Sequence, residues 1–285
     1  MSIERIKHLG LREKVMTAEQ AAEFIGHDML VGISGFTGAG YPKALPTAIA
    51  NRAKAHHVEG KEFAIRMVTG ASTAPECDGV LAEASALSFR SPFQSDPTLR
   101  NNINVGNIAY QDMHLSHVEQ QIRQGFYGDM DVAIIEATGI TEDGKIIPSM
   151  GIGHNNEILK AAKKVIIEVN TAQNELLEGM HDIYFDVGTP PHRKAIPVTQ
   201  AFDRIGSPYL ECDLDKIVAI VFTNASDRNS KFADPDETSK RIAAQIIDFF
   251  SHEVKAGRLP KNLLPLQSGV GNVANAVLAG LLDAP

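Results

Sequence analysis

A glycine-rich turn near the end of the sequence has the residue types needed to hold a negative charge. Apolar residues 263–266 lead into Gly269-Val270-Gly271-Asn272, and a small-residue stretch typical of a helix follows. Such a turn directs several backbone N–H groups to one point in front of a helix N-terminus, where an anion is stabilised. An oxyanion that exists only during a reaction would be stabilised there in the same way. We therefore predict an anion or oxyanion site at residues 269–272.

A second glycine loop, Gly35-Phe36-Thr37-Gly38-Ala39-Gly40, lies between a predicted strand and a predicted helix. Its glycines would let backbone amides approach a phosphate or carbonyl oxygen closely. The spacing is neither the dinucleotide fingerprint nor a Walker loop, and a tight turn without a ligand explains it equally well. Ligands of open α/β sheets bind where strands end at their carboxyl side, which keeps this loop a candidate binding site.

Three other groups of residues have chemistry to offer. Arg228, in a polar loop, could bind a carboxylate or phosphate through its planar guanidinium, or simply be solvated. Glu136 ends a predicted buried strand and could act as acid, base or nucleophile, whereas Glu142-Asp143 fits a hairpin turn. His114 and His117 would share a helix face, but no clear further ligand follows, so we predict no metal site. No Gly-x-Ser-x-Gly elbow occurs, which disfavours serine-hydrolase chemistry.

The elements that would position these residues alternate between strand and helix. This order predicts an α/β fold with a mostly parallel sheet flanked by helices. Thr17 and Gln20 fit a helix capping box, Asp143-Gly144 fits a hairpin, and residues 88–93 and 101–114 read as mostly loop. We expect strands at 29–34, 63–68, 132–137, 165–169 and 216–222, and helices at 45–56, 76–86, 115–124 and 157–162.

A polar stretch after residue 223 suggests a domain boundary. We place an N-terminal domain at 1–225 and assign 226–285 to the incomplete beginning of a second α/β domain. That segment should hold a helix capped by Asp234, with an apolar face of Ile242, Ile246 and Phe249. A strand at 263–266, the glycine turn and a last helix should follow.

Composition excludes several classes of protein. The chain has 27 basic and 35 acidic residues, a net charge of −8, so nonspecific nucleic-acid binding is disfavoured. No apolar run reaches the roughly 18 residues of a membrane span, and the N-terminus lacks a signal-peptide pattern. Cys77 and Cys212 form no CxxC pair and fit reduced thiols. We expect a cytoplasmic protein.

Five motifs, taken together and in order, resemble the acetyl-CoA hydrolase/transferase family of class I CoA-transferases. The resemblance runs from about Arg5 to Pro285. It rests on Ser34-Gly35-Phe36-Thr37-Gly38-Ala39-Gly40-Tyr41-Pro42-Lys43, Thr69-Gly70-Ala71-Ser72-Thr73, Phe89-Arg90-Ser91-Pro92-Phe93, the stretch from Glu136 to Gly144, and Gly269-Val270-Gly271-Asn272 with the helix after it.

The resemblance implies two related α/β domains with an active site between them. There a glutamate attacks an acyl-CoA thioester and passes CoA between small acids such as succinate and acetate through a glutamyl-CoA thioester. Val270 and Gly271 match the oxyanion-binding turn, with the Val270 N–H as donor. The implied substrate-binding residues are Gly35, Phe36, Gly38, Gly40, Ser72, Ser95, Arg228, Gly269 and Asn272; Ser95 stands where the family leads us to expect threonine.

The resemblance also implies that the CoA thioester is a substrate, that no cofactor or metal is needed, and that the full-length protein is a homodimer. The family's nucleophilic glutamate is expected beyond Pro285, so we expect little or no transferase activity from these residues alone. An acetyl-CoA hydrolase, an inactive CoA-binding fragment and, more weakly, a phosphosugar isomerase remain alternatives. Without its partner domain, the segment after Arg228 should expose apolar surface and favour dimerisation or aggregation.

Overall fold

The computed structural model describes residues 3–185, 188–229, 234–269 and 271–282. Its contacts divide the chain into two compact units. The first comprises residues 1–199 and 203–229, and the second comprises 200–202 and 230–285. The division after residue 229 leaves Asp227 and Arg228 in the first unit.

The first unit is built on one eight-stranded sheet with the strand order β4-β3-β2-β1-β5-β7-β8. All pairs along this path are parallel, and β6 pairs antiparallel with β5. The predicted α/β fold with a mostly parallel sheet is thereby confirmed. The strands are β1 (Leu30–Ile33), β2 (Ile65–Thr69), β3 (Leu87–Ser91), β4 (Ala109–Tyr110), β5 (Val132–Ile140), β6 (Ile146–Pro148), β7 (Lys164–Asn170) and β8 (Ile217–Thr223).

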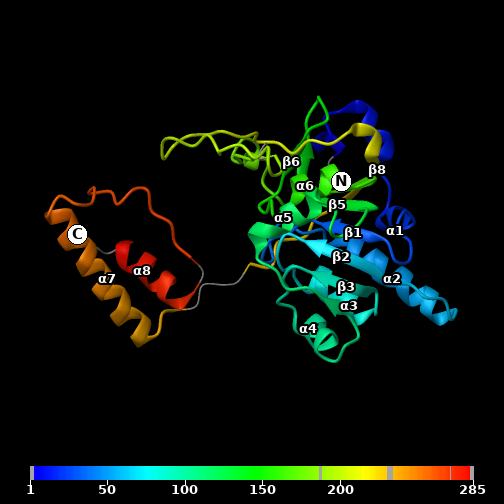
Figure 1. The fold of residues 1–285 in the computed structure, drawn as a ribbon, viewed down its shortest axis with the longest axis horizontal. Helices are drawn as coiled ribbons and strands as arrows, with labels where there is room; N and C mark the ends of the chain where they lie inside the picture. The colour runs from blue at the N-terminus through cyan, green and yellow to red at the C-terminus, as the bar shows by residue number, and fades with distance from the viewer. Residues whose placement is uncertain (1–2, 186–187, 230–233, 270, 283–285) are drawn as a thin grey trace. The chain divides into compact units, whose positions relative to one another are not determined.

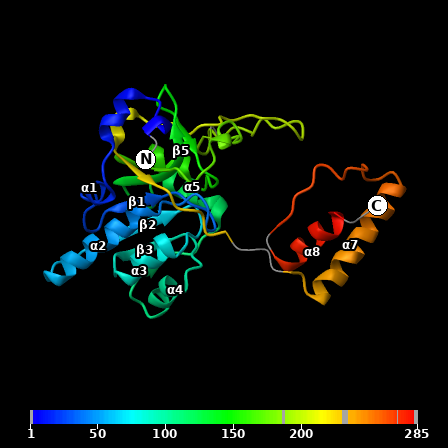
Figure 2. The same ribbon diagram turned by 180° about the vertical axis from the view of Figure 1, so that it is seen from behind.

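Helices cover both faces of this sheet (Figure 1). Neighbouring strand residues point to opposite faces, so Ile134 joins the apolar core on one side and Ile135 the core on the other. The first core includes α1 (Ala18–Ala22), α2 (Ala44–Val58), α3 (Val80–Glu83) and α4 (Pro97–Asn104), and the second includes α5 (Leu115–Arg123) and α6 (Asn155–Ala161). Figure 2 shows the same arrangement from behind. Because both faces are covered, the central strands carry runs of apolar residues rather than an alternating pattern.

Local signals set several of these boundaries. The Thr17 side chain accepts from the Gln20 N–H while Gln20 bonds back to the Thr17 N–H, which confirms the predicted capping box before α1. Between β5 and β6, Gly144 has φ +82° and the Thr141 N–H donates to the Lys145 carbonyl at 2.9 Å. The predicted Asp-Gly hairpin is therefore also confirmed.

The stretch between β2 and α5 departs from prediction. Residues 88–93 and 101–114 were expected to be mostly loop, yet they contribute to β3, α4 and β4. The expected helix 76–86 is a short π-helical segment, Pro75–Gly79, followed by the single turn of α3. Strand β3 is not predicted from the sequence because it contains Arg90, a charged residue that is wholly buried.

The second unit contains two helices, α7 (Glu237–Lys255) and α8 (Asn272–Leu282), which pack together. The predicted cap was wrong: Asp236, not Asp234, accepts from the Ser239 N–H, at 2.7 Å. In the described part of this unit no strand forms, so the strand expected at 263–266 was wrong as well.

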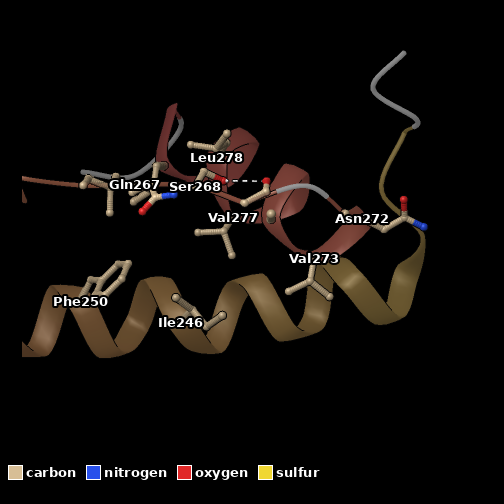
Figure 3. Close-up of a pocket in the computed structure, with 13 residues that line it drawn as sticks. Ile246, Phe250, Gln267, Ser268, Asn272, Val273, Val277 and Leu278 are labelled. Atoms are coloured by element: carbon tan, nitrogen blue, oxygen red, sulfur yellow. Dashed lines mark hydrogen bonds between the residues drawn. The ribbon is translucent and has the colours of Figure 1, made fainter. Parts of the chain in front are cut away.

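The apolar face of α7 also differs from the prediction. Ile246 packs toward α8, as Figure 3 shows, but Ile242 and Phe249 are exposed. The packed face contains Ala243, Ile247 and Phe250 instead, at the helical spacing of three and four residues.

Candidate functional site

Three glycine-containing loops interlock at the carboxyl ends of β1 and β2. A Cβ on Gly70 would lie 2.4 Å from the Gly35 carbonyl oxygen, and one on Gly40 would lie 2.6 Å from the Gly151 nitrogen. A Cβ on Gly153 would likewise lie close to another loop, 2.8 Å from the Gly70 Cα. Each of these positions therefore needs glycine, because a side chain would displace the backbone of another loop.

The first glycine loop is held by its own amides. The Phe36 and Ala39 N–H groups donate to each other's carbonyl, and the Gly40 N–H donates to Asp227 at 3.2 Å. Gly35, Gly38 and Gly40 have φ of +129°, +83° and +67°. These hydrogen bonds occupy backbone amides that the sequence predicts as possible anion ligands. The Phe36 side chain of this loop is 40% exposed to solvent.

The helix after this loop is capped by an internal carboxylate. Glu168, on β7, accepts from the N–H groups of Lys43 at 2.6 Å, Ala44 at 3.0 Å and Leu45 at 2.9 Å. Burial raises the pKa of Glu168 while these amides oppose the increase. The Glu168 carboxyl group thus already occupies the first amides of α2, so these amides are not free to bind a ligand phosphate.

Arg228 lies directly against the first loop. Its N–H donates to the Gly38 carbonyl at 3.0 Å, and a Cβ on Gly38 would lie 2.9 Å from the Arg228 carbonyl oxygen. Its guanidinium donates to Glu76 from Nε at 2.8 Å and from Nη2 at 2.5 Å. The Tyr41 hydroxyl donates to the other Glu76 oxygen at 3.1 Å. The structure therefore brings Arg228 together with Gly35, Phe36, Gly38 and Gly40.

Ser72 belongs to the same group of loops. It is buried, and the neighbouring Thr73 N–H donates to Asp78 at 3.0 Å. The buried Arg90 guanidinium bonds Asp78 through two N–H groups and also donates to the Ala71 carbonyl. A buried ion pair therefore fixes the loop that carries Ser72.

Ser95 is exposed at the start of α4, where Asp96 caps the helix. Among the interactions of the described residues, none joins Ser95 to the interlocked loops.

Glu136 sits behind the first loop in a buried polar cluster. Its carboxylate accepts from Lys43 at 2.5 Å, from Asn170 at 3.0 Å and from Gln173 at 3.1 Å. Burial raises the pKa of Glu136 to about 7, even though the Lys43 ammonium acts in the opposite direction. With no exposed surface and these three partners, Glu136 is placed as a structural carboxylate, not as a nucleophile facing substrate.

The second glycine turn lies in the second unit. Val270 falls outside the described residues. Nothing in the described chain lies within 4 Å of a Cβ built on Gly269 or Gly271, and Gly271 has φ +142°. The turn and the start of α8, including Asn272, border a pocket shown in Figure 3, into which α7 and α8 direct mainly apolar side chains. These include Ile246, Phe250, Val273, Val277 and Leu278.

Other candidate groups take structural positions. His114 and His117 stack edge to face with ring centres 5.6 Å apart at the start of α5. Within the described ranges, no group of three or more His, Cys, Asp or Glu side chains is arranged to hold a metal. Both cysteines are free, and burial raises the pKa of Cys77 and takes that of Cys212 to about 11.

Sequence reasoning missed part of this site. Glu76 and Asp227 are ordinary charged residues with partners distant in sequence, so no local pattern marked them. Lys43 ends the first motif of the family resemblance, but that motif does not show its pairing with Glu136 and Asp227. The loop 149–154, by contrast, carries a signal. Gly151-Ile152-Gly153 directly follows a strand, as the other two glycine loops of this site do.

The fold and the interlocked glycine loops define an α/β protein with its candidate site at the carboxyl edge of a parallel sheet. The sequence pattern of the acetyl-CoA hydrolase/transferase N-terminal domain matches residues 5–222. This chain therefore belongs to the acetyl-CoA hydrolase/transferase family.

Several relatives are similar over nearly the whole chain. A succinyl-CoA:acetate CoA-transferase from Clostridium kluyveri is 47% identical over 281 residues, 99% of this chain and 52% of that protein. An acetyl-CoA hydrolase from Schizosaccharomyces pombe is 41% identical, over 99% of this chain and 55% of that protein. The chain thus spans about half the length of the curated relatives it matches.

Among solved structures, RipA from Yersinia pestis has a TM-score of 0.65 and 18% identity, over 100% of this chain and 56% of that chain. This likeness supports the fold alone. In the part of the chain that the structure describes, every helix is too short or too polar to cross a membrane.

Proposed function

We propose that the protein containing this chain transfers CoA between small carboxylic acids. The observation that carries the proposal is the 47% identity to a succinyl-CoA:acetate CoA-transferase across nearly all of these residues. The site geometry is consistent with it, because Arg228 stands beside the glycine loop with a guanidinium suited to a carboxylate. The CoA thioester is a substrate in this proposal, and no cofactor or metal is required.

The proposed chemistry is covalent. A glutamate attacks the thioester carbonyl, and an oxyanion forms that the turn at 269–272, with the Val270 N–H as donor, stabilises. The CoA thiolate departs, and an acyl-glutamyl anhydride remains on the enzyme. The thiolate then attacks the glutamyl carbonyl of this anhydride and releases the acyl group as a free carboxylate. The acceptor carboxylate attacks the glutamyl-CoA carbonyl and expels the CoA thiolate, which gives a second anhydride. The thiolate then attacks the acceptor's carbonyl in that anhydride, so that the new thioester forms and the glutamate carboxylate is released. Losing one oxyanion donor typically raises the barrier by about 3–4 kcal/mol.

We further propose that the attacking glutamate lies outside these 285 residues. The two glutamates buried near the first loop support this assignment, since Glu136 and Glu168 are each fully enclosed and hydrogen bonded. Ser72, Ser95, Gly269 and Asn272 complete the proposed substrate-binding set, and the full-length protein is proposed to be a homodimer.

A thioester-exchange assay tests the proposal. This chain and a version extended to the length of its relatives would each receive succinyl-CoA and labelled acetate. We expect label in acetyl-CoA only with the extended protein. Exchange by these 285 residues alone would contradict the placement of the nucleophile outside them, and no exchange by the extended protein would contradict transfer.

Acetyl-CoA hydrolysis is the second candidate, favoured by the 41% identity to an acetyl-CoA hydrolase. Water would then replace the acceptor carboxylate at the same site. Release of free CoA from acetyl-CoA without added carboxylate, at a rate matching or exceeding exchange, would favour hydrolysis. A chain that binds CoA in calorimetry but supports neither reaction in extended form would instead be a binding module.

The exposed apolar surface of the second unit supports a tendency to associate. Phe249 and Leu264 are each more than half exposed, and Leu282 is 88% exposed. We expect light scattering on these 285 residues to show dimers or larger species. A monodisperse monomer would contradict this expectation.

A further inference from the structure

A buried charge cluster lies behind the first glycine loop. The Lys43 ammonium contacts Glu136 at 2.5 Å and Asp227 at 2.9 Å, and the three side chains are 3%, 0% and 7% exposed. Lys43 also donates to the Tyr41 carbonyl at 2.8 Å. Burying ions costs several kcal/mol each, so such a cluster is weak evidence for stability by itself. Its geometry indicates what else it does.

Asp227 connects the segment after β8 to three other parts of the first unit. Its carboxylate accepts from the Gly40 N–H at 3.2 Å and from the Gln173 amide at 2.9 Å, besides pairing with Lys43. Gln173 and Asn170 also bond Glu136, and Asn170 donates to the Ala225 carbonyl at 2.8 Å. The polar loop 224–229 is thereby fastened to the core of the sheet.

The next residue, Arg228, points outward while Asp227 points inward. Its backbone is fixed to Gly38 and its guanidinium to Glu76, which also binds Tyr41. The pKa of Glu76 is lowered: partial burial raises it, but the hydrogen bonds from Arg228 and Tyr41 outweigh that effect. Among the described residues no interaction engages Nη1 of Arg228, and the side chain is 63% exposed. One edge of the guanidinium is held and the other faces solvent.

We propose that Asp227, through its buried pair with Lys43, is the positioning residue for Arg228, and that Glu76 orients the guanidinium toward the carboxylate group of a substrate. This inference rests on the proposed function for the identity of that carboxylate. Lys43 is essential to it, since without the ammonium Asp227 and Glu136 would be two buried carboxylates that repel each other. Glu76 holds Arg228 in one rotamer, which lowers the entropy lost when a ligand binds.

Hydrogen exchange on this 285-residue chain tests the positioning directly. We compare the wild type with Asp227→Ala, and follow peptides that contain the Gly40 and Arg228 amides. Both amides should exchange at least about tenfold faster in the variant, which corresponds to losing one charge-assisted hydrogen bond. Asp227→Asn, which keeps an oxygen for the Gly40 N–H but not the charge for Lys43, should fall between the two. Asp129→Ala is the matched control, because Asp129 is an exposed carboxylate paired with Lys163 at the surface.

Kinetics on the extended protein test the consequence for substrate. Asp227→Ala and Glu76→Gln should raise KM for the acceptor carboxylate about tenfold and change kcat much less, the pattern of lost binding rather than lost chemistry. Glu76→Asp should recover part of the loss.

The two measurements fail separately. Unchanged exchange at Arg228 in Asp227→Ala would overturn the positioning role whatever the enzyme does. Faster exchange with an unchanged KM would overturn the link to substrate. An extended wild type without thioester chemistry would contradict the proposed function, and the exchange data would still decide whether Asp227 holds Arg228.

Discussion

The two glycine turns of this chain look alike in sequence but differ in their surroundings. Each presents glycines two residues apart and leads into a helix. Around Gly38 and Gly40, the backbone of other segments lies within 3 Å of where a side chain would begin. Around Gly269 and Gly271, nothing in the described chain lies within 4 Å. Packing thus requires glycine in the first turn, whereas in the described part of the second turn only the backbone conformation of Gly271, with φ +142°, favours it.

The helix starts differ in the same sense. The first N–H groups of α2 donate to Glu168, so a side chain of the protein caps the helix that follows the first loop. At the second turn, the Asn275 N–H bonds the Gly271 carbonyl, and the turn borders an apolar pocket. The first turn is therefore better described as a rigid support for Arg228 and Phe36 than as an anion site, and the oxyanion site at the second turn stays a prediction.

The largest effect is expected from Gly40→Ala. The substitution adds a Cβ 2.6 Å from the Gly151 nitrogen at a position with φ +67°. Overpacking and left-handed strain together should lower the free energy of unfolding by about 3–5 kcal/mol, as measured by urea denaturation.

Gly60→Ala is its matched control, because Gly60 has φ +71° and a Cβ built there would meet no atom of the described chain within 4 Å. That variant carries the strain alone and should lose about 1 kcal/mol. Equal losses in the two variants would show that the loops yield and do not interlock.

Glu168→Ala should rank second. It removes the acceptor of three N–H groups at the buried start of α2 and leaves them unpaired. We expect a loss of about 2–3 kcal/mol in urea denaturation, at the upper end of cap removals because the site is buried. Removing an exposed cap, Asp236→Ala at α7, should cost about 1 kcal/mol or less. A Glu168 variant as stable as the Asp236 variant would contradict the internal cap.

A pH effect is expected at the first turn, since a buried acid, Glu136, lies behind it and no buried acid occurs in the described part of the second unit. Burial raises the pKa of Glu136 to about 7 against an ordinary value of 4.5, with Lys43 opposing it. Because the folded pKa is the higher one, the stability that the protonated group contributes is complete below pH 4.5. It is lost as pH rises through 7.

The wild type should therefore lose stability relative to Glu136→Gln between pH 5 and 7, by at most about 1.4 kcal/mol per pH unit, and run parallel to it above about pH 8. Urea denaturation across this range measures the difference. Glu142→Gln, at an exposed glutamate, is the control and should leave the free energy of unfolding unchanged across this pH range. A difference independent of pH would contradict the raised pKa.

The contrast between the turns also explains what sequence could predict. Mostly apolar runs such as 132–137 and 165–169 predict central strands, because burial on both faces favours apolar residues at successive positions. Strand β3 was missed because Arg90 is neutralised by Asp78, a partner on another element. The run at 263–266 was taken for a strand, but Leu264 and Leu266 are exposed and no neighbouring strand pairs with it in the described chain. A strand needs a partner, which a local pattern does not reveal.

The site divides in the same way. Glycine spacing marked the loops at 35–40 and 269–272, an arginine in a polar loop marked Arg228, and family resemblance added Ser72. The residues proposed to hold Arg228 are Lys43, Glu76 and Asp227. The contact between Glu76 and Arg228 spans 152 residues of sequence, and the contact between Gly40 and Asp227 spans 187. Charged residues this far apart have no spacing to recognise, so only the folded chain identifies them.

The smallest effect on stability is expected from Gly269→Ala. Gly269 does not have a positive φ, and a Cβ there would meet no atom within 4 Å in the described chain. Its urea denaturation should match the wild type within about 0.5 kcal/mol. If the second turn serves the reaction, the same substitution should nevertheless lower kcat in the extended protein, because it changes how the neighbouring N–H groups meet an oxyanion. Loss of stability with unchanged kcat would reverse the contrast between the turns, making the second a packing feature like the first.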